Sequence, residues 1–289
     1  MPMPLRVHVI GASGRSGAAL CRALLNANAA PVPIVRNTNR WRATGIQCPA
    51  RIADLSDPIG LHDALSGADH IVSTAHARYA AAVIAAAPSA ATLIFLGSTR
   101  KFTRWPDEHG NGVLAGEAAF LASGRSGVML HPSMIYGADG EDNVRRLAAL
   151  LRRLPFLPLP GGGTVLVQPI HQDDVTRAIL AALNRPWNGP HSIVIAGRTT
   201  LPYADFVRAV AIAAKLAPPR IVPCRVALLL AAAALSRWLP LLPTVRTAEI
   251  RRLLEDKAFD IAPMRQHLGI EPIRLAEGLA RTFAPLHKD

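Results

Sequence analysis

The stretch VHVIGASGRSG, residues 7–17, decides the fold of this 289-residue chain. Its first four residues form an apolar run typical of a buried strand, and three glycines follow at once: Gly11, Gly14 and Gly17. In this order they permit a tight turn, a close approach of the backbone to a phosphate, and close packing of a helix on the strand. The helix that follows would offer unpaired N–H groups to an anion. The stretch therefore predicts the first βα unit of a dinucleotide-binding domain.

Short apolar runs alternate with helical patterns on the C-terminal side of this unit. The first helix has its apolar face at Leu20, Ala23, Leu24 and Ala27, and further strands are expected at 32–35, 70–74, 92–97, 128–130 and 191–196. This alternation predicts an α/β fold, with a Rossmann-type doubly wound parallel sheet and a smaller, mostly helical C-terminal lobe. We expect residues 1–160 to form the dinucleotide-binding domain. Residues 161–289 would form a substrate or partner lobe, with 169–196 packing back on the sheet.

Several elements are expected in the second half of the chain. Residues 143–154 have the pattern of an amphipathic helix, and the segment PFLPLPGGG, residues 155–163, is typical of a loop. Asp173 or Asp174 would cap a helix that runs to about Asn184, and the chain from Arg198 onward has a helical pattern broken by prolines.

The most apolar stretch of the chain covers residues 224–243. Its unbroken apolar core, residues 226–235, is too short to span a bilayer. A helix over 226–238 would either pack into the core or lie on a membrane surface, and the sequence leaves both alternatives open.

The charge and the cysteines limit the class of partner. The formal net charge is +12, but the basic residues are spread along the chain, and no nucleic-acid-binding motif is found. We therefore expect no nucleic-acid partner, whereas peripheral membrane contact stays open. Cys21, Cys48 and Cys224 lie far apart in the sequence, which indicates neither a disulfide framework nor a metal site. No signal peptide is recognised at the N-terminus, so a cytoplasmic protein is expected.

The spacing GxxGxxG resembles the glycine loop of the extended and atypical branch of the short-chain dehydrogenase/reductase superfamily, which includes NAD-dependent epimerases and dehydratases. Further segments match in the expected order over nearly the whole chain: Ala53-Asp54-Leu55, Gly67-Ala68-Asp69, Leu96-Gly97-Ser98, 131–137, 168–175 and 268–279. Within this branch the chain is most similar to NAD(P)H-binding proteins related to the nucleotide-binding accessory subunit of respiratory complex I. The segments 115–117 and 160–163 suggest that subgroup.

The resemblance implies a set of cofactor-binding residues. They are Gly11, Ser13, Gly14, Arg15, Ser16, Gly17, Arg36, Asp54, Leu55, Thr74, Ala75 and Pro132. NAD-selective sites usually carry Asp or Glu after the second strand, where the carboxylate accepts from the ribose 2′-hydroxyl. Here Arg36 holds that position, and Arg15 matches a second position that contacts a 2′-phosphate. The sequence therefore favours NADP(H) over NAD(H).

The Tyr-x-x-x-Lys pair that performs proton transfer in the superfamily is absent. Alignment on Glu117 places His109 in the tyrosine position and Val113 in the lysine position. His109 is a substitute acid/base or a surface-loop histidine. Ser98 and Thr99 match the position that hydrogen-bonds the substrate in relatives, and they complete the candidate catalytic residues; the alternative is that they form a simple turn at the end of a strand.

Other polar residues near these positions are weaker candidates. Lys101 is near enough in sequence to enter the same cleft, while His131 and His171 are expected to be structural. Two hypotheses follow, and the sequence leaves both open. One is an NADP(H)-dependent reductase of a hydrophobic carbonyl substrate; the other is a nucleotide-binding redox sensor or structural subunit without turnover.

Overall fold

A computed structural model of the chain describes residues 5–138, 142–154, 156–227 and 254–284. Its centre is a parallel sheet of seven strands in the order β11-β6-β5-β4-β1-β2-β3. Their bounds are β1 Arg6–Ile10, β2 Ala30–Val35, β3 Arg51–Ile52, β4 His70–Ser73, β5 Thr92–Leu96, β6 Gly127–Pro132 and β11 Pro190–Ile195. The strand order reverses between β1 and β4, and this is the crevice where ligands bind in open α/β sheets. The predicted Rossmann-type sheet and its six expected strands are confirmed.

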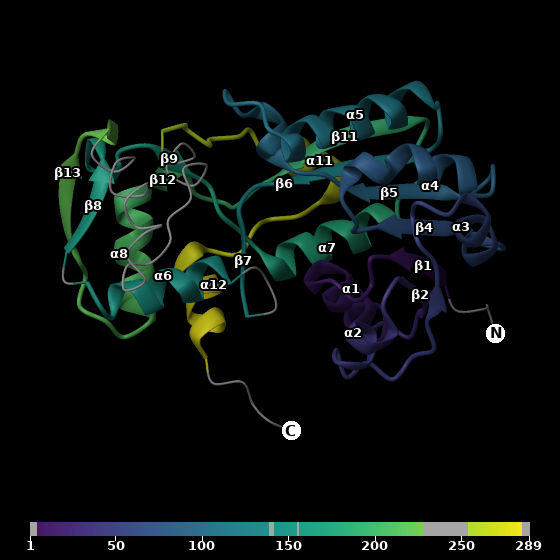
Figure 1. Cartoon of the computed structure of the whole chain (residues 1–289), viewed down its shortest axis with the longest axis horizontal. Helices are drawn as coiled ribbons and strands as arrows, with labels where there is room; N and C mark the ends of the chain where they lie inside the picture. Colours follow the sequence, from purple (N-terminus) through teal and green to yellow (C-terminus); the bar gives the residue numbers. More distant parts are fainter. Residues whose placement is uncertain (1–4, 139–141, 155, 228–253, 285–289) are drawn as a thin grey trace.

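Helices cover both faces of this sheet (Figure 1). The alternation in β1 explains why: Val7 and Val9 pack with residues of α1, α7 and α11, whereas Ile10 packs with residues of α3, α4 and α5. The helices are α1 Arg15–Asn26, α2 Thr38–Arg42, α3 Pro58–Leu65, α4 Ala80–Ala86, α5 Glu108–Ala122, α6 Asn143–Leu151, α7 Gln172–Leu183, α8 Tyr203–Ala213, α11 Ala262–Leu268 and α12 Leu275–Phe283. Three 3₁₀ turns complete the described helical elements: η1 Ala77–Tyr79, η2 Thr99–Phe102 and η3 Gly161–Gly163.

The helices α6, α8 and α12 gather beyond the carboxyl ends of the sheet strands (Figure 1). Three two-stranded sheets accompany them: β7 Ile135–Tyr136 with β10 Ile170–His171, β8 Phe156–Pro160 with β13 Arg220–Cys224, and β9 Leu166–Val167 with β12 Leu201–Pro202. Their shared core includes Tyr136, Val144, Phe206 and Leu279. This lobe faces the edge of the sheet where the glycine loop lies.

Two expectations for the second half of the chain are wrong. The segment expected as a loop, 155–163, contains β8, which pairs in parallel with β13. The chain after Arg198 is not helical throughout, because it also supplies β12 and β13. Each of these strands is short and proline-containing, and its partner is distant in sequence, so local patterning does not indicate it.

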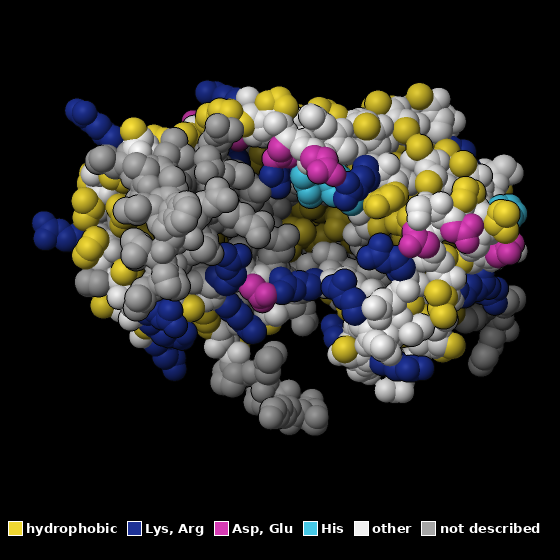
Figure 2. Space-filling view, viewed as in Figure 1, with side chains coloured by type: hydrophobic (Ala, Val, Ile, Leu, Met, Phe, Trp, Pro, Cys, Tyr) yellow, Lys and Arg dark blue, Asp and Glu magenta, His cyan; other side chains and the backbone are white. Residues whose placement is uncertain are grey.

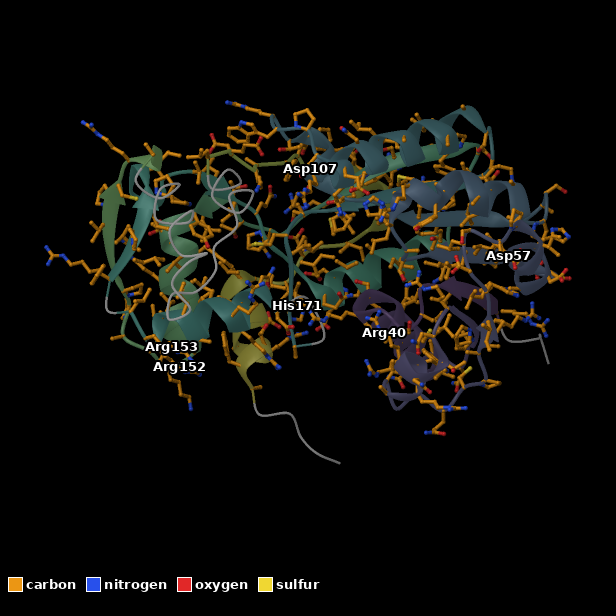
Figure 3. The ribbon with its side chains drawn as sticks, in the orientation of Figure 1. Arg40, Asp57, Asp107, Arg152, Arg153 and His171 are labelled. Atoms are coloured by element: carbon orange, nitrogen blue, oxygen red, sulfur yellow. The ribbon has the colours of Figure 1, made fainter. Side chains whose placement is uncertain are left out.

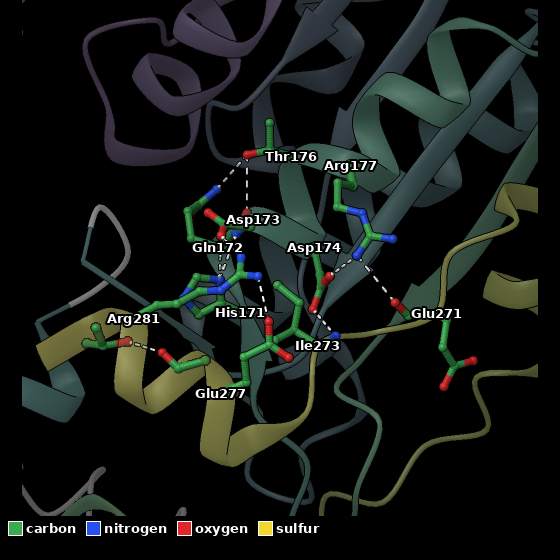
Figure 4. A network of polar contacts seen from close by, with 12 residues as sticks. His171, Gln172, Asp173, Asp174, Thr176, Arg177, Glu271, Ile273, Glu277 and Arg281 are labelled. Atoms are coloured by element: carbon green, nitrogen blue, oxygen red, sulfur yellow. Dashed lines mark hydrogen bonds and ion pairs between the residues drawn. The ribbon is translucent and has the colours of Figure 1, made fainter. Parts of the chain in front are cut away.

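The start of α7 connects the sheet to the lobe (Figure 4). His171, rather than Asp173 or Asp174, caps this helix, because its Nδ1 accepts from the Asp173 N–H at 3.2 Å. The fully buried Asp174 accepts from Ile273 N–H and from Arg177, at 2.8 and 2.7 Å. Arg281 on α12 donates to Asp173 at 2.9 Å. His171 therefore has the structural role expected for it.

The apolar helix expected over 226–238 lies mostly outside the described residues. Within the described part of the chain, no helix combines the length and apolar character that crossing a bilayer requires.

Candidate functional site: a glycine loop and a histidine-rimmed hollow

The glycine loop lies between β1 and α1, at the point where the strand order reverses. A Cβ on Gly17 would stand 2.4 Å from the Gly11 carbonyl oxygen and 2.8 Å from the Ala12 Cα. Gly11 adopts a positive φ of 76°, and its carbonyl accepts from the Gly14 N–H at 2.9 Å. No side chain caps α1, and its first turn carries no acidic residue. The backbone N–H groups of this turn are therefore available to an anion.

A cavity of about 220 Å³ opens beside this loop. It is lined by Ser13, Gly14, Arg15, Ala18, Arg22, Thr44 and Ala138. The Ser16 hydroxyl donates to the Gln172 side chain at 3.0 Å and ties the loop to the start of α7. Two arginines and an uncapped helix start give this cavity a positive potential that suits phosphate.

Arg15 has a partner that the sequence did not indicate. Its guanidinium forms an ion pair with Asp142, which precedes α6. Both side chains are about half exposed, so the pair is weak and can exchange for another anion. Asp142 carries no motif signal, and only the fold places it near the glycine loop.

The residues expected at the adenosine end lie at the carboxyl ends of β2, β3 and β4. Arg36 is exposed directly after β2, and its positive charge helps to lower the pKa of Asp54, after the larger effect of the hydrogen bonds from Ser56. The two side chains are thus electrostatic neighbours. Leu55 is half-buried beside Asp54, and Ala75 is half-buried after β4. The Thr74 hydroxyl donates to the Ile10 and Gly11 carbonyls, at 3.0 and 3.3 Å, and links β4 to the glycine loop.

Ser98 and Thr99 lie directly after β5, in partly exposed positions. The Ser98 hydroxyl caps η2 by accepting from the Arg100 N–H at 3.1 Å. The Thr99 hydroxyl donates to the carbonyl of the buried Pro132 at 3.2 Å, which joins the ends of β5 and β6.

Lys101 is held by an ion pair. Its ammonium group forms an ion pair with Glu117, and only 9% of its side chain is exposed. The same carboxylate accepts from the buried His131 Nε2 at 3.1 Å and from the Ser192 hydroxyl at 2.5 Å. Burial alone would raise the pKa of Glu117, but these hydrogen bonds outweigh it and lower the pKa to about 2. We call Lys101, Glu117 and His131, together with the exposed Ser192 at their edge, the buried polar cluster.

The buried polar cluster also makes a hydrogen bond with the backbone directly after β5. The Ser98 N–H donates to Nδ1 of His131 at 3.3 Å, so neutral His131 carries its proton on Nε2 and donates it to Glu117. Gly97 leaves room for this ring, since a Cβ there would lie 2.4 Å from Nδ1. His131 is structural, as expected. Local patterning does not predict the cluster as a whole, because its members come from four separate elements: η2, α5, β6 and β11.

His109 lies in the first turn of α5 rather than in a loop. Its ring meets that of His76 edge to face, with the ring centroids 4.4 Å apart. Val113, in the position where relatives carry lysine, is buried against the sheet. One group of histidine atoms lies on the rim of a hollow with a hydrophobic floor, beside acidic and basic groups, and a second lies at the far right edge of the molecule (Figure 2). Asp107, which caps α5, lies on the same side of the molecule (Figure 3).

Among the described residues, no group of three or more His, Cys, Asp or Glu side chains is arranged to hold a metal ion. The glycine loop accounts for six of the residues expected to bind a cofactor, and the ends of β2, β3, β4 and β6 carry the others. His76 and Asp142 are the neighbours of these residues that sequence reasoning missed.

No protein-family model and no curated protein matches the chain. Solved structures do match it over nearly their whole lengths. A UDP-glucuronic acid 4-epimerase from Bacillus cereus, in complex with UDP-glucuronic acid and NAD, is 17% identical, with a TM-score of 0.73 and coverage of 96% of this chain and 98% of that one. The dTDP-glucose 4,6-dehydratase DesIV from Streptomyces venezuelae, with NAD and TYD bound, is 16% identical, with a TM-score of 0.72 and 96% of each chain covered.

A nucleoside-diphosphate-sugar epimerase from Pseudomonas aeruginosa is 20% identical, with a TM-score of 0.71 and 96% of each chain covered. At these identities the similarity is one of fold. The closer similarity to the complex I accessory subunit stays a prediction. The chain thus shares the fold of the NAD-dependent epimerases and dehydratases of the extended short-chain dehydrogenase/reductase type.

Proposed function

We propose that this chain binds NADP(H) at the reversal point of its sheet, with the diphosphate on the glycine loop and the 2′-phosphate near Arg36 and Arg15. The observation that carries the proposal is the glycine loop itself. Its glycines leave no room for side chains, and it opens on an uncapped helix start beside an arginine-lined cavity. When bound, the dinucleotide would supply a two-electron redox carrier.

The choice of NADP(H) rests on charge at the end of β2. Two of the solved neighbours, the Bacillus cereus epimerase and DesIV, carry NAD, whereas this chain has exposed Arg36 where a carboxylate would accept from a ribose hydroxyl. A guanidinium pairs bidentately with a phosphate. Within the described residues, no ion pair is formed by Arg36, and its charge acts on Asp54 only through space. Its guanidinium can therefore bind a ligand.

Replacing Arg36 by Asp is expected to reverse the preference for the phosphorylated dinucleotide. The loss of a charge-assisted hydrogen bond, about 1.5–3 kcal/mol, corresponds to roughly a ten- to hundredfold lower affinity for NADPH. Calorimetric titration with NADPH and NADH measures both affinities. Arg40→Asp makes the same charge change on neighbouring α2 and should leave the ratio within about twofold. Equal affinities of the unmodified protein for the two dinucleotides would exclude the NADP(H) proposal.

Asp142→Asn is expected to tighten NADPH binding, because it removes the carboxylate that competes with phosphate for Arg15. An exposed ion pair contributes up to about 1 kcal/mol, so the gain is up to about fivefold. Asp205→Asn, which removes the exposed partner of Arg208 on α8, is the matched control. Unchanged NADPH affinity in Asp142→Asn would show that this ion pair does not compete with the phosphate for Arg15.

We propose that the bound dinucleotide serves to reduce a hydrophobic carbonyl substrate in the hollow. The apolar floor and the histidine-bearing rim favour it (Figure 2). The alternative is binding without turnover, and the burial of Val113 and the pairing of Lys101 with Glu117 favour that alternative. Oxidation of NADPH, followed by its absorbance against a panel of aldehydes, ketones and quinones, separates the two. Turnover with any member of the panel supports the reductase.

A further inference from the structure

We propose that His76 and His109 together form the proton-transfer site of the hollow, in place of the missing tyrosine and lysine. The inference rests on the proposed reductase function and assigns it a site. The two rings come from different elements, His76 from the turn after β4 and His109 from the first turn of α5. Their ring centroids are 4.4 Å apart and their planes meet at 83°.

The fold reserves space for His76. Gly112 lies one turn after His109 on α5, and a Cβ there would be 2.8 Å from Cε1 of His76 and 3.2 Å from the Arg78 Cβ. Glycine inside a helix destabilises it by roughly 1 kcal/mol relative to alanine. The absence of a side chain at Gly112 therefore leaves space beside α5, and the half-buried imidazole of His76 fills that space.

The tautomer of His76 is fixed by its neighbour. Nδ1 accepts from the Arg78 N–H at 3.1 Å, and this contact caps η1. A ring nitrogen that accepts a hydrogen bond carries no proton, so neutral His76 carries its proton on Nε2. This nitrogen can donate to a carbonyl oxygen or pass a proton to a neighbouring imidazole.

Charges around the pair limit how many protons it holds. Burial lowers the pKa of His76, and Arg78 and Arg100 lower it further, while Glu108 acts in the opposite direction. Asp107 and Glu108 lie on the α5 side, next to His109. Two imidazolium ions at this separation repel each other. The pair therefore carries at most one positive charge, because a charge on either ring opposes protonation of the other.

The proton balance of a carbonyl reduction fits this pair. The carbonyl carbon gains a C–H bond with two electrons, while the dinucleotide of the proposed function goes from its reduced to its oxidised form. The C=O π bond breaks, and the oxygen takes the proton from the protonated pair, so one N–H bond breaks and one O–H bond forms. The pair is left neutral, and water returns its proton.

Nuclear magnetic resonance of the ring protons, without any dinucleotide, tests the coupling directly. In the unmodified protein we expect the His76 and His109 signals to titrate in two linked steps, whereas His76→Gln turns that of His109 into a single step at higher pH. Gly112→Ala should also turn the His109 titration into a single step, because the added methyl carbon displaces the His76 ring while both histidines remain. The helix α5 itself should be at least as stable, since alanine favours helices more than glycine does. His191 and His267, with ring centroids 6.4 Å apart, are the control pair. Independent curves for His76 and His109 would overturn the proposal.

Kinetics tests the proton transfer. With a carbonyl substrate from the panel, His76→Gln, His109→Gln and Gly112→Ala should each lower the rate by about 10²–10⁴-fold, while NADPH affinity stays unchanged. His267→Gln should keep the full rate. Absence of turnover in the unmodified protein, or unchanged rates in the variants, would overturn the proposed role. Failure of NADPH to bind would instead refute the proposed function. The two failures can be told apart, because the pH titration of the histidine rings by nuclear magnetic resonance requires no dinucleotide.

Discussion

Gly17→Ala is expected to weaken dinucleotide binding by at least about a hundredfold, the loss that roughly 3 kcal/mol of strain produces. The reason is steric. The added methyl carbon would lie 2.4 Å from the Gly11 carbonyl oxygen and 2.8 Å from the Ala12 Cα, and both neighbours are backbone atoms that no rotamer change can move. The loop and the start of α1 would have to separate. The N–H groups that would hold the diphosphate would then lose their common orientation.

Calorimetric titration with NADPH measures the affinity, and thermal unfolding without ligand shows how much of the effect is general destabilisation. Gly45→Ala is the matched control, because Gly45 has a positive φ of 72° but nothing within 4 Å of the added carbon. It should lose stability through backbone strain alone and keep the affinity. Wild-type affinity in Gly17→Ala would show that the diphosphate is held elsewhere.

The sequence predicted those parts of the structure that local patterning encodes. The strand β1, the glycine loop and α1 follow one another without interruption, so a single stretch carries the apolar period, the turn and the helix start. The same holds for β4, β5 and β6, whose apolar residues are mostly buried in the sheet, while β11 is buried at Ile193 and Ile195.

Features built from distant residues escaped the sequence analysis. The strands β8 and β13 stabilise each other across a large sequence separation, and each alone contains a proline that indicates a loop. Asp142 meets Arg15, and His76 meets His109, only because the fold brings their elements to the same edge of the sheet. One local feature pointed to a close contact: Gly112 lies inside a helix, where a glycine destabilises the helix and usually makes room for a neighbouring group.

Lys101→Met is expected to destabilise the protein by about 3 kcal/mol or more, because it leaves the Glu117 carboxylate buried without its cation. The two side chains are only 9% and 13% exposed. The hydrogen bonds from His131 and Ser192 remain, but the full positive charge of the lysine is lost. Chemical denaturation measures the free energy of unfolding. Glu108→Gln is the control on the same helix, since Glu108 is 88% exposed beside Arg78, and its loss should cost less than about 1 kcal/mol.

A double variant separates the ion pair from the space that it fills. If buried charge causes the loss, Lys101→Met with Glu117→Met should recover most of it, because apolar groups of similar volume can replace a buried pair with little penalty. Additive losses would show instead that packing around η2 and α5 dominates. That result would contradict the electrostatic account of the buried polar cluster.

Acid provides an independent test of the same carboxylate. The pKa of Glu117 is lowered to about 2 in the folded chain from 4.5, so its ionised form stabilises the fold above pH 4.5, and this contribution is lost as the pH falls toward 2. The shift corresponds to about 3 kcal/mol. The difference in unfolding free energy between the unmodified protein and Glu117→Gln should therefore shrink steadily across this window. A difference that stays constant from pH 5 to pH 2 would show that Glu117 is not the group that titrates. The hydrogen bonds from Lys101, His131 and Ser192 would then stabilise the fold only by holding these side chains in place, and not through the charge of Glu117.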